Sequence, residues 1–342
     1  MGLMAPPELL YLTQQEVIDV APSLADSVDL IEGVLREHGE KQVENPPKPG
    51  VHPLPDTFIH AMPAFLRRRR QVGLKWVSGF FDNPTLGLPS ISGLIILNDP
   101  NTGVPTAVMD CAYLTALRTA AASGVAARHL ANPDAAVLGI VGAGVQGRFN
   151  LITVKTAVPA LRTVRLFDVV ERTSTHFVRE MAGHVDCEIQ AVDSMAEAIL
   201  GADVVVTATS QLHEVLFKAA WVREGALVLP VHSYGWEREA IEQADKFVAD
   251  DWAQLRASVV GPGKLYETLP EPYAELGEIV VGRKPGRESP TERIIDFNYG
   301  LAIHDVAMGH EVLARARAKG LGTPLKQLDG VMPFSEQTIP GP

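Results

Sequence analysis

AVLGIVGAGVQG, residues 136–147, is an apolar run that ends in Gly142, Gly144 and Gly147. The run predicts a buried parallel strand and the residues after it predict a helix, so the glycines fall at a strand-to-helix turn. There Gly142 permits the tight bend, Gly144 lets a pyrophosphate approach the backbone, and Gly147 lets the helix pack on the strand. The free N–H groups at the start of the helix attract phosphate. This stretch therefore predicts a dinucleotide site in a doubly wound α/β sheet.

An acidic residue extends the dinucleotide pattern. A second strand is expected at Thr163–Phe167, and Asp168 follows it, about twenty residues beyond the last glycine. A carboxylate there accepts hydrogen bonds from the adenosine ribose and repels a 2′-phosphate, so NAD(H) is the expected cofactor. Arg172 lies nearby and keeps NADP(H) as the alternative. Further cofactor contacts are expected from Val145, Gln146, Thr209, Ser210, Val231 and Thr119.

Composition narrows the class of protein. The chain has 342 residues, enough for two domains, and a net charge of −11, which argues against nucleic acid or an anionic membrane as partner. The two cysteines, Cys111 and Cys187, stand far apart without CxxC or histidine partners, so neither a disulfide framework nor a metal site is expected. No signal peptide or membrane span is evident, and a cytoplasmic protein is expected.

Two kinds of pattern divide the chain. Before residue 114, alternating apolar runs and turns, among them the hairpin turn Asp99–Gly103, predict a mostly antiparallel sheet with helices. From Ala135 onward, strands alternate with helical stretches, as in a Rossmann-type parallel sheet. An amphipathic helix at Ile303–Lys319 ends at Gly320. We therefore expect an antiparallel α+β domain followed by a nucleotide-binding domain.

Three cations are candidates for substrate chemistry. Arg118 lies on a helix of small apolar residues, where a guanidinium either binds a substrate carboxylate or pairs with an internal aspartate. Lys75 lies in an apolar strand, where it either has a lowered pKa and transfers protons or simply faces solvent. Lys48 is held in the proline-rich segment 45–55, although such lysines are often only exposed.

Histidines and aromatic residues give weaker indications. His52, His60 and His232 are candidates for the site, each with a purely structural role as the alternative. Trp76, Phe80 and Tyr234 indicate a bulky or weakly polar substrate side chain.

The chain resembles the ornithine cyclodeaminase and mu-crystallin family. The resemblance covers most of residues 62–320 and rests on segments that occur in the family's order: GLKWVSGFFDNPTLGLPSISGLIILNDPNTGVPTAVMD, LTALRTAAASGVAARHLA, IVGAGVQG, DVVVTATS and GLAIHDVA. It implies an NAD(P)-dependent enzyme, expected to be a homodimer, that transfers hydride between nicotinamide C4 and the α-carbon of a small amino or imino acid. It also implies an α+β substrate and dimerisation domain formed by residues 1–125 with 305–342, and a nucleotide-binding domain at 126–304. By the same resemblance Lys75 lies beside the substrate and Arg118 binds its carboxylate.

Two positions depart from the family pattern. Lys48 stands where a carboxylate-binding arginine is usual, and Ser233 stands where cyclodeaminases and related alanine dehydrogenases have an aspartate. Mu-crystallin-like reductases have a serine there. An imino acid (ketimine) reductase or amino acid dehydrogenase is therefore expected. An ornithine or lysine cyclodeaminase is the first alternative, and a non-catalytic NAD(P)H- and ligand-binding protein is the second.

Overall fold

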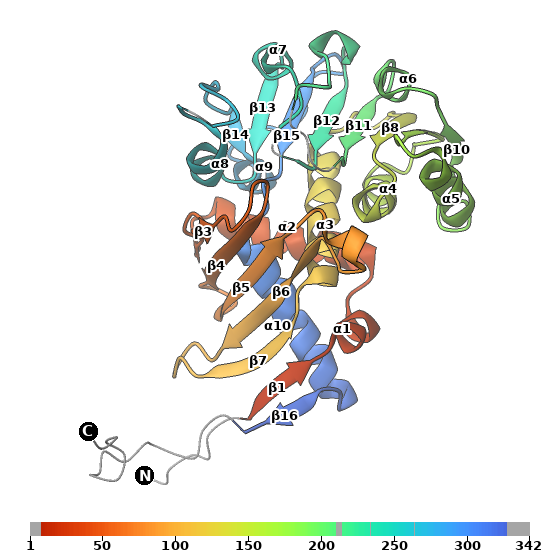
Figure 1. Cartoon of the computed structure of the whole chain (residues 1–342). Helices are drawn as coiled ribbons and strands as arrows, with labels where there is room; N and C mark the ends of the chain where they lie inside the picture. The colour runs from red at the N-terminus through yellow and green to blue at the C-terminus, as the bar shows by residue number, and fades with distance from the viewer. Residues whose placement is uncertain (1–7, 210–213, 233, 263, 327–342) are drawn as a thin grey trace, which may run out of the picture.

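Two β-sheets carry the fold of the computed structural model, which describes residues 8–209, 214–232, 234–262 and 264–326 (Figure 1). The first sheet has the strand order β16-β1-β7-β6-β5-β4-β2, with β3 paired to β4. Its strands are β1 (Leu9–Leu12), β2 (Val43–Glu44), β3 (Gly50–Val51), β4 (Phe58–Leu66), β5 (Gln71–Gly79), β6 (Ile91–Asn98), β7 (Pro105–Asp110) and β16 (Thr323–Leu325). Only β1 and β7 run parallel within it, so the mostly antiparallel sheet is confirmed.

The second sheet is parallel throughout, with the order β10-β9-β8-β11-β12-β15-β13-β14. Its strands are β8 (Val137–Val141), β9 (Thr163–Phe167), β10 (Glu188–Ala191), β11 (Val204–Thr207), β12 (Leu227–Pro230), β13 (Lys246–Ala249), β14 (Ala274–Glu275) and β15 (Ile294–Phe297). The chain winds first to one side of β8 and then to the other. Ligands bind at the carboxyl ends of the strands beside such a reversal, here between β8 and β11. The doubly wound sheet is confirmed.

Helices join and cover the two sheets. They are α1 (Gln14–Val20), α2 (Leu24–Gly39), α3 (Ala112–Leu130), α4 (Val145–Ala157), α5 (Glu171–Met181), α6 (Met195–Ile199), α7 (Arg238–Glu242), α8 (Trp252–Val259), α9 (Leu276–Val280) and α10 (Ala302–Lys319), with 3₁₀ turns η1 (Asn83–Leu86) and η2 (Ala219–Trp221). Thr13 caps α1 through a reciprocal capping box with Glu16, and Gly320 ends α10 at φ 66°. Among the described residues no helix is both long and apolar enough to cross a membrane.

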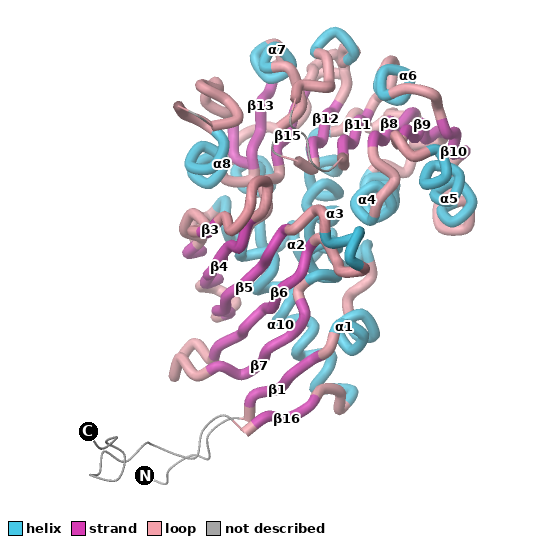
Figure 2. Tube along the Cα trace, in the orientation of Figure 1, coloured by secondary structure: helices cyan, strands magenta, loops and turns pink. Residues whose placement is uncertain are grey.

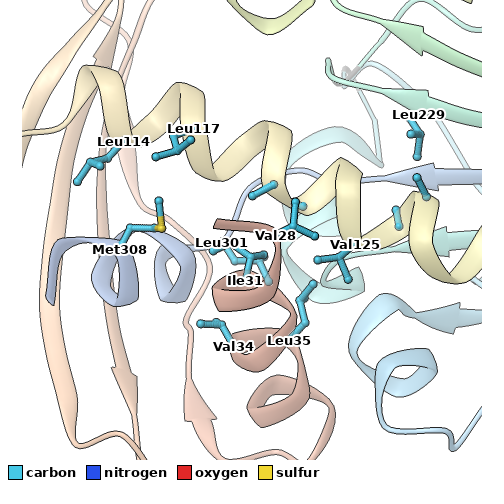
Figure 3. Close-up of a cluster of buried hydrophobic side chains, with 14 of the residues drawn as sticks. Val28, Ile31, Val34, Leu35, Leu114, Leu117, Val125, Leu229, Leu301 and Met308 are labelled. Atoms are coloured by element: carbon cyan, nitrogen blue, oxygen red, sulfur yellow. The ribbon is translucent and has the colours of Figure 1, made fainter. Parts of the chain in front are cut away.

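The helix α3 connects the two sheets. Its tube extends from the level of β6 toward β12, and α10 runs along the antiparallel sheet (Figure 2). Between α2, α3 and α10 lies an apolar core, to which Ile31, Leu117 and Met308 each contribute a fully buried side chain (Figure 3). The small residues of α3 allow these helices to approach closely. This packing holds the antiparallel sheet against the strand ends of the parallel sheet. The domain boundaries at 125 and 305 stay a prediction.

The glycine turn is built as the sequence indicated. A Cβ added at Gly147 would lie 2.1 Å from the carbonyl oxygen of Gly142, so α4 crosses the end of β8 at backbone contact. Gly142 itself has φ 109°, and a Cβ there would lie 2.6 Å from the carbonyl oxygen of Ala208. Both positions therefore require glycine.

We expect Gly147→Ala to lower the free energy of unfolding by roughly 1–3 kcal/mol, because the added methyl group must push α4 off the strand. Gly183→Ala is the matched control, since a Cβ at Gly183 would meet nothing within 4 Å. Urea unfolding followed by circular dichroism measures both variants. Equal stabilities of the two variants would contradict the close packing.

Candidate active site

A cavity of 790 Å³ opens where the two sheets meet. It brings together predicted residues that are distant in the sequence. Those that line it are Lys48, His52, His60, Lys75, Arg118, Thr119, Gln146, Thr209, Val231, His232 and Tyr234. The candidate substrate residues and part of the candidate cofactor residues therefore share one space.

A buried aspartate holds two of the predicted cations. Asp305, from α10, is fully buried, and its Oδ2 atom lies 2.8 Å from Nζ of Lys75. Its Oδ1 atom accepts a hydrogen bond of 3.2 Å from Nε of Arg118. Lys75 is only 1% exposed, so the solvent-facing alternative for this lysine is wrong. The internal aspartate considered as a partner for Arg118 is present, and Arg118 also faces the cavity.

Burial and charge set the protonation states of this group. Burial, and then the neighbouring charge of Arg118, lower the pKa of Lys75 to about 8, although Asp305 opposes both effects. Burial raises the pKa of Asp305, but Arg118 and Lys75 together outweigh that effect and hold it below its usual value. At neutral pH the site therefore holds an ionised carboxylate between a guanidinium and an ammonium ion that releases its proton within reach of physiological pH.

Gly300, at the turn before α10, leaves space for the guanidinium of Arg118. Gly300 has φ 90°, and a Cβ there would lie 2.5 Å from Nη1 of Arg118. The absence of a side chain leaves room for the guanidinium, whose Nε atom is engaged by Asp305. The terminal nitrogens are the donors suited to a planar carboxylate.

Lys48 contacts the same turn. Its ammonium donates to the carbonyl oxygens of Tyr299 at 3.0 Å and Gly300 at 3.1 Å, and it lies 3.8 Å from the centre of the Tyr299 ring. Burial lowers the pKa of Lys48 to about 7, and the carboxylate of Asp250 opposes that shift. The backbone N–H of Gly300 in turn donates to Asp250 at 2.7 Å. The merely exposed alternative for Lys48 is therefore wrong.

The glycine loop leaves room for a phosphate. A Cβ at Gly144 would meet nothing within 4 Å, and this glycine is the N-cap of the thirteen-residue helix α4. Asp168, after β9, accepts hydrogen bonds from the backbone N–H groups of Ala143 at 2.8 Å and Val170 at 2.9 Å. Its carboxylate is thus fixed beside the loop, while Arg172 and Val145 are exposed. The residues present fit a dinucleotide.

Unpartnered polar atoms line the cavity at the ends of β11 and β15. The Oγ1 atom of Thr209 and the Oδ1 atom of Asn298 are buried without a hydrogen-bond partner in the described part of the chain, and the buried ring of His232 lines the same cavity. Since buried polar atoms are nearly always paired, these two oxygen atoms indicate a polar ligand. Burial lowers the pKa of His232 to about 4, so its ring is neutral at pH 7.

The structure corrects and extends the sequence-based site. Trp76 points away from the cavity and is 46% exposed, and Phe80 is not among the described residues that line it; Tyr234 does line it. Asn298 was not predicted, because the segment FNYG (297–300) contains no recognisable site motif. Its place at the cavity follows only from the position of β15. Ser210 and Ser233 lie outside the described residues.

Comparisons with known proteins agree with this geometry. The model of the "Ornithine cyclodeaminase/mu-crystallin family" matches residues 10–320. The nodulation efficiency protein NfeD of Rhizobium meliloti is 41% identical over 92% of this chain and 97% of its own. The Δ1-pyrroline-2-carboxylate reductase of Thermococcus litoralis, solved with NADH and L-proline, is 30% identical with a TM-score of 0.85 over 93% of this chain and all of its own. An archaeal alanine dehydrogenase dimer with bound NAD is 33% identical with a TM-score of 0.83, covering 94% of this chain and all of its own.

We expect Gly144→Ala to weaken NADH binding at least tenfold, because the methyl group would occupy the space into which a pyrophosphate must come. The stability of the fold should change by no more than about 0.5 kcal/mol, since the methyl group meets no protein atom. Fluorescence titration with NADH measures the first quantity, and thermal unfolding measures the second. An unchanged NADH affinity would contradict the placement of the phosphates.

Proposed function

The chain belongs to the ornithine cyclodeaminase/mu-crystallin family, and we propose that it is an NADH-dependent reductase of small α-imino acids, or a dehydrogenase that runs the same step in reverse. The observation that carries this proposal is the Lys75–Asp305–Arg118 group, whose two cations line the same cavity as Gln146 of the glycine stretch. In this group Arg118 can bind a substrate carboxylate, and Lys75 beside it can donate a proton.

The cofactor would be held by the parallel sheet. The glycine loop and the start of α4 suit its pyrophosphate, and Asp168 suits its adenosine ribose and favours NADH over NADPH. Thr209 and Asn298 offer free polar atoms to its nicotinamide half. When bound, the reduced nicotinamide supplies a hydride to the α-carbon of the imine. NADH and NAD occupy the two solved relatives.

The protein's own groups would bind and protonate the substrate. The terminal nitrogens of Arg118 would bind the substrate carboxylate, and Lys48, which lines the same cavity, would add positive charge. Lys75, held by Asp305, would donate a proton to the imine nitrogen as the carbon is reduced. Ser233 would lie where cyclodeaminases have an aspartate, which favours reduction over ring closure with loss of ammonia.

We also propose that the protein is a homodimer. The outer face of the antiparallel sheet exposes Trp76 and its cross-strand neighbour Leu94, at 46% and 39%, with Tyr11 exposed on β1. Large exposed apolar side chains that adjoin on a sheet are typical of a protein interface. A dimer is also the form of the solved alanine dehydrogenase.

A spectrophotometric screen tests the activity. NADH oxidation with 2-oxo acids plus ammonia or methylamine, and with cyclic imines, would support the reductase. Release of ammonia from ornithine or lysine with catalytic NAD⁺ and no net NADH would establish a cyclodeaminase instead. Tight NADH binding without turnover of any imine would favour a binding protein.

We expect Lys75→Met to lower kcat by a factor of roughly 10²–10⁴, because the proton donor is lost. NADH affinity should persist, since Lys75 lies on the antiparallel sheet. Lys41→Met is the matched control, because the Lys41 side chain is 61% exposed and pairs with Glu275 on the surface. Turnover by Lys75→Met at the rate of the control would rule out the assigned role.

We expect the reductive kcat to fall as pH rises through about 8, where Lys75 loses its proton. The oxidative kcat should rise over the same range, because that direction needs the neutral amine. Asp305→Asn should move this limb to lower pH, since the carboxylate raises the pKa of Lys75. Parallel pH profiles of the wild type and this variant test the assignment, and a limb that does not move would count against it.

A further inference from the structure

The cavity continues beyond Lys75 along a wall of rings. On β4 the side chains of Phe58, His60 and Met62 face the cavity at alternate positions. The rings of Phe58 and His60 stack with centres 4.4 Å apart and an interplanar angle of 21°. Phe81, which follows β5, meets Phe58 edge-on at 6.3 Å and 62°. We call Phe58, His60 and Phe81 the ring wall.

Two glycines hold the ring wall in place. Gly79 lies opposite Phe58 in the pairing of β5 with β4, and a Cβ at Gly79 would lie 2.3 Å from Cε1 of Phe58. Gly50 lies opposite His60 in the pairing of β3 with β4, and a Cβ there would lie 2.2 Å from Cδ2 of His60. Each ring fills the space that a cross-strand side chain would take. The wall is therefore packed into shape before any ligand arrives.

The register of β4 and β5 places the ring wall at a definite distance from the reacting groups. Met62 lies opposite Lys75, and His60 lies opposite Val77. At about 3.3 Å per residue, His60 is roughly 7 Å and Phe58 roughly 13 Å along the strand from that point. A substrate whose imine lies at Lys75 would meet Val77 and His60 with its first side-chain carbons and the Phe58 ring beyond them.

The charges around the cavity oppose a cationic side chain. Lys48, Lys75 and Arg118 all line it, and Asp305 is already paired with two of them. Burial lowers the pKa of His60 to about 4, and Lys48 contributes to that shift, so the His60 ring is uncharged at neutral pH. Among the described lining residues, the remaining carboxylate is Asp56, which lies exposed on the rim.

Resting on the proposed function, we infer that the substrate is an α-imino acid with an apolar side chain of aromatic size, which the ring wall receives. In the reduction, the imine C=N becomes an amine C–N bond: the α-carbon gains a hydride from NADH and the nitrogen gains a proton from Lys75. The side chain takes no part in this chemistry. It determines which imine is held with its α-carbon in place.

A series of 2-oxo acids, each combined with methylamine and NADH, tests this inference. We expect kcat/KM for the phenylpyruvate and 2-oxo-4-phenylbutanoate imines to exceed that for the pyruvate imine at least tenfold, because the ring wall buries the added apolar surface. Oxaloacetate and 2-oxo-5-guanidinopentanoate supply the anionic and cationic side chains. Each should fall at least tenfold below phenylpyruvate.

A variant locates the preference on the ring wall. Phe58→Ala should reduce the ratio of kcat/KM for phenylpyruvate to that for pyruvate at least tenfold. Phe65→Ala is the matched control, because Phe65 lies on the same strand outside the cavity and contacts Arg67; it should leave the ratio unchanged. If Phe58→Ala does not fold, the wild-type series decides. A second readout uses the wild-type NAD⁺ complex, which N-methylphenylalanine should stabilise more than N-methylalanine does.

The outcomes separate the two proposals. A preference for pyruvate, oxaloacetate or the guanidino acid, with NADH oxidised, would overturn the inference and leave the proposed function standing. An equal ratio in Phe58→Ala and the wild type would also overturn it. No oxidation of NADH with any imine would remove the proposed function, and the inference with it.

Discussion

The structure depends on a carboxylate buried where no water reaches it. Asp305 is fully buried on α10, and an unpaired charge in such a place costs several kcal/mol. Lys75 from β5 and Arg118 from α3 compensate that charge together, so three elements distant in the sequence must meet at one point. A buried ionic group of this kind contributes little net stability compared with apolar packing. Its main effect is on geometry, because Asp305 holds the two cations in place where they would otherwise extend into solvent.

That fixed point lies beside the edge of the parallel sheet. Gln146, in the first turn of α4, donates to the carbonyl oxygen of Ala116 on α3 at 3.4 Å, two residues from Arg118. The helix that carries the guanidinium is thus joined to the helix that would receive the pyrophosphate. Lys48 adds a second connection through the carbonyl groups of Tyr299 and Gly300. The relative position of the two sheets is set by the same contacts that build the cavity.

Local patterns made much of the fold predictable. The apolar run before Gly142 and the helix end at Gly320 each depend on a few neighbouring residues, so the sequence alone shows them. The short strands β13 and β15 carry little periodicity and were not predicted. The sequence also did not show that the Trp76 side chain points away from the cavity, because a shift of one residue in register turns a side chain to the other face of a sheet.

The site was only partly predictable, for a related reason. Arg118 and Lys75 stand out as cations in apolar segments, but Asp305 lies 187 residues from Arg118 within an ordinary helical pattern. Its role exists only once α10 packs on the antiparallel sheet. The carbonyl partners of Lys48 and the free amide oxygen of Asn298 likewise depend on the turn between β15 and α10. Long-range packing, and not residue type, creates these features.

The fate of the transferred hydride tests the central claim most directly. The protein would be incubated with NADH that carries deuterium at both C4 positions and with the methylamine imine of a 2-oxo acid, and the product would be examined by NMR and mass spectrometry. The account predicts that each NADH oxidised delivers one deuterium to the α-carbon of the N-methyl amino acid. Oxidation of NADH without deuterium at the α-carbon, or an unlabelled amine product, would contradict it.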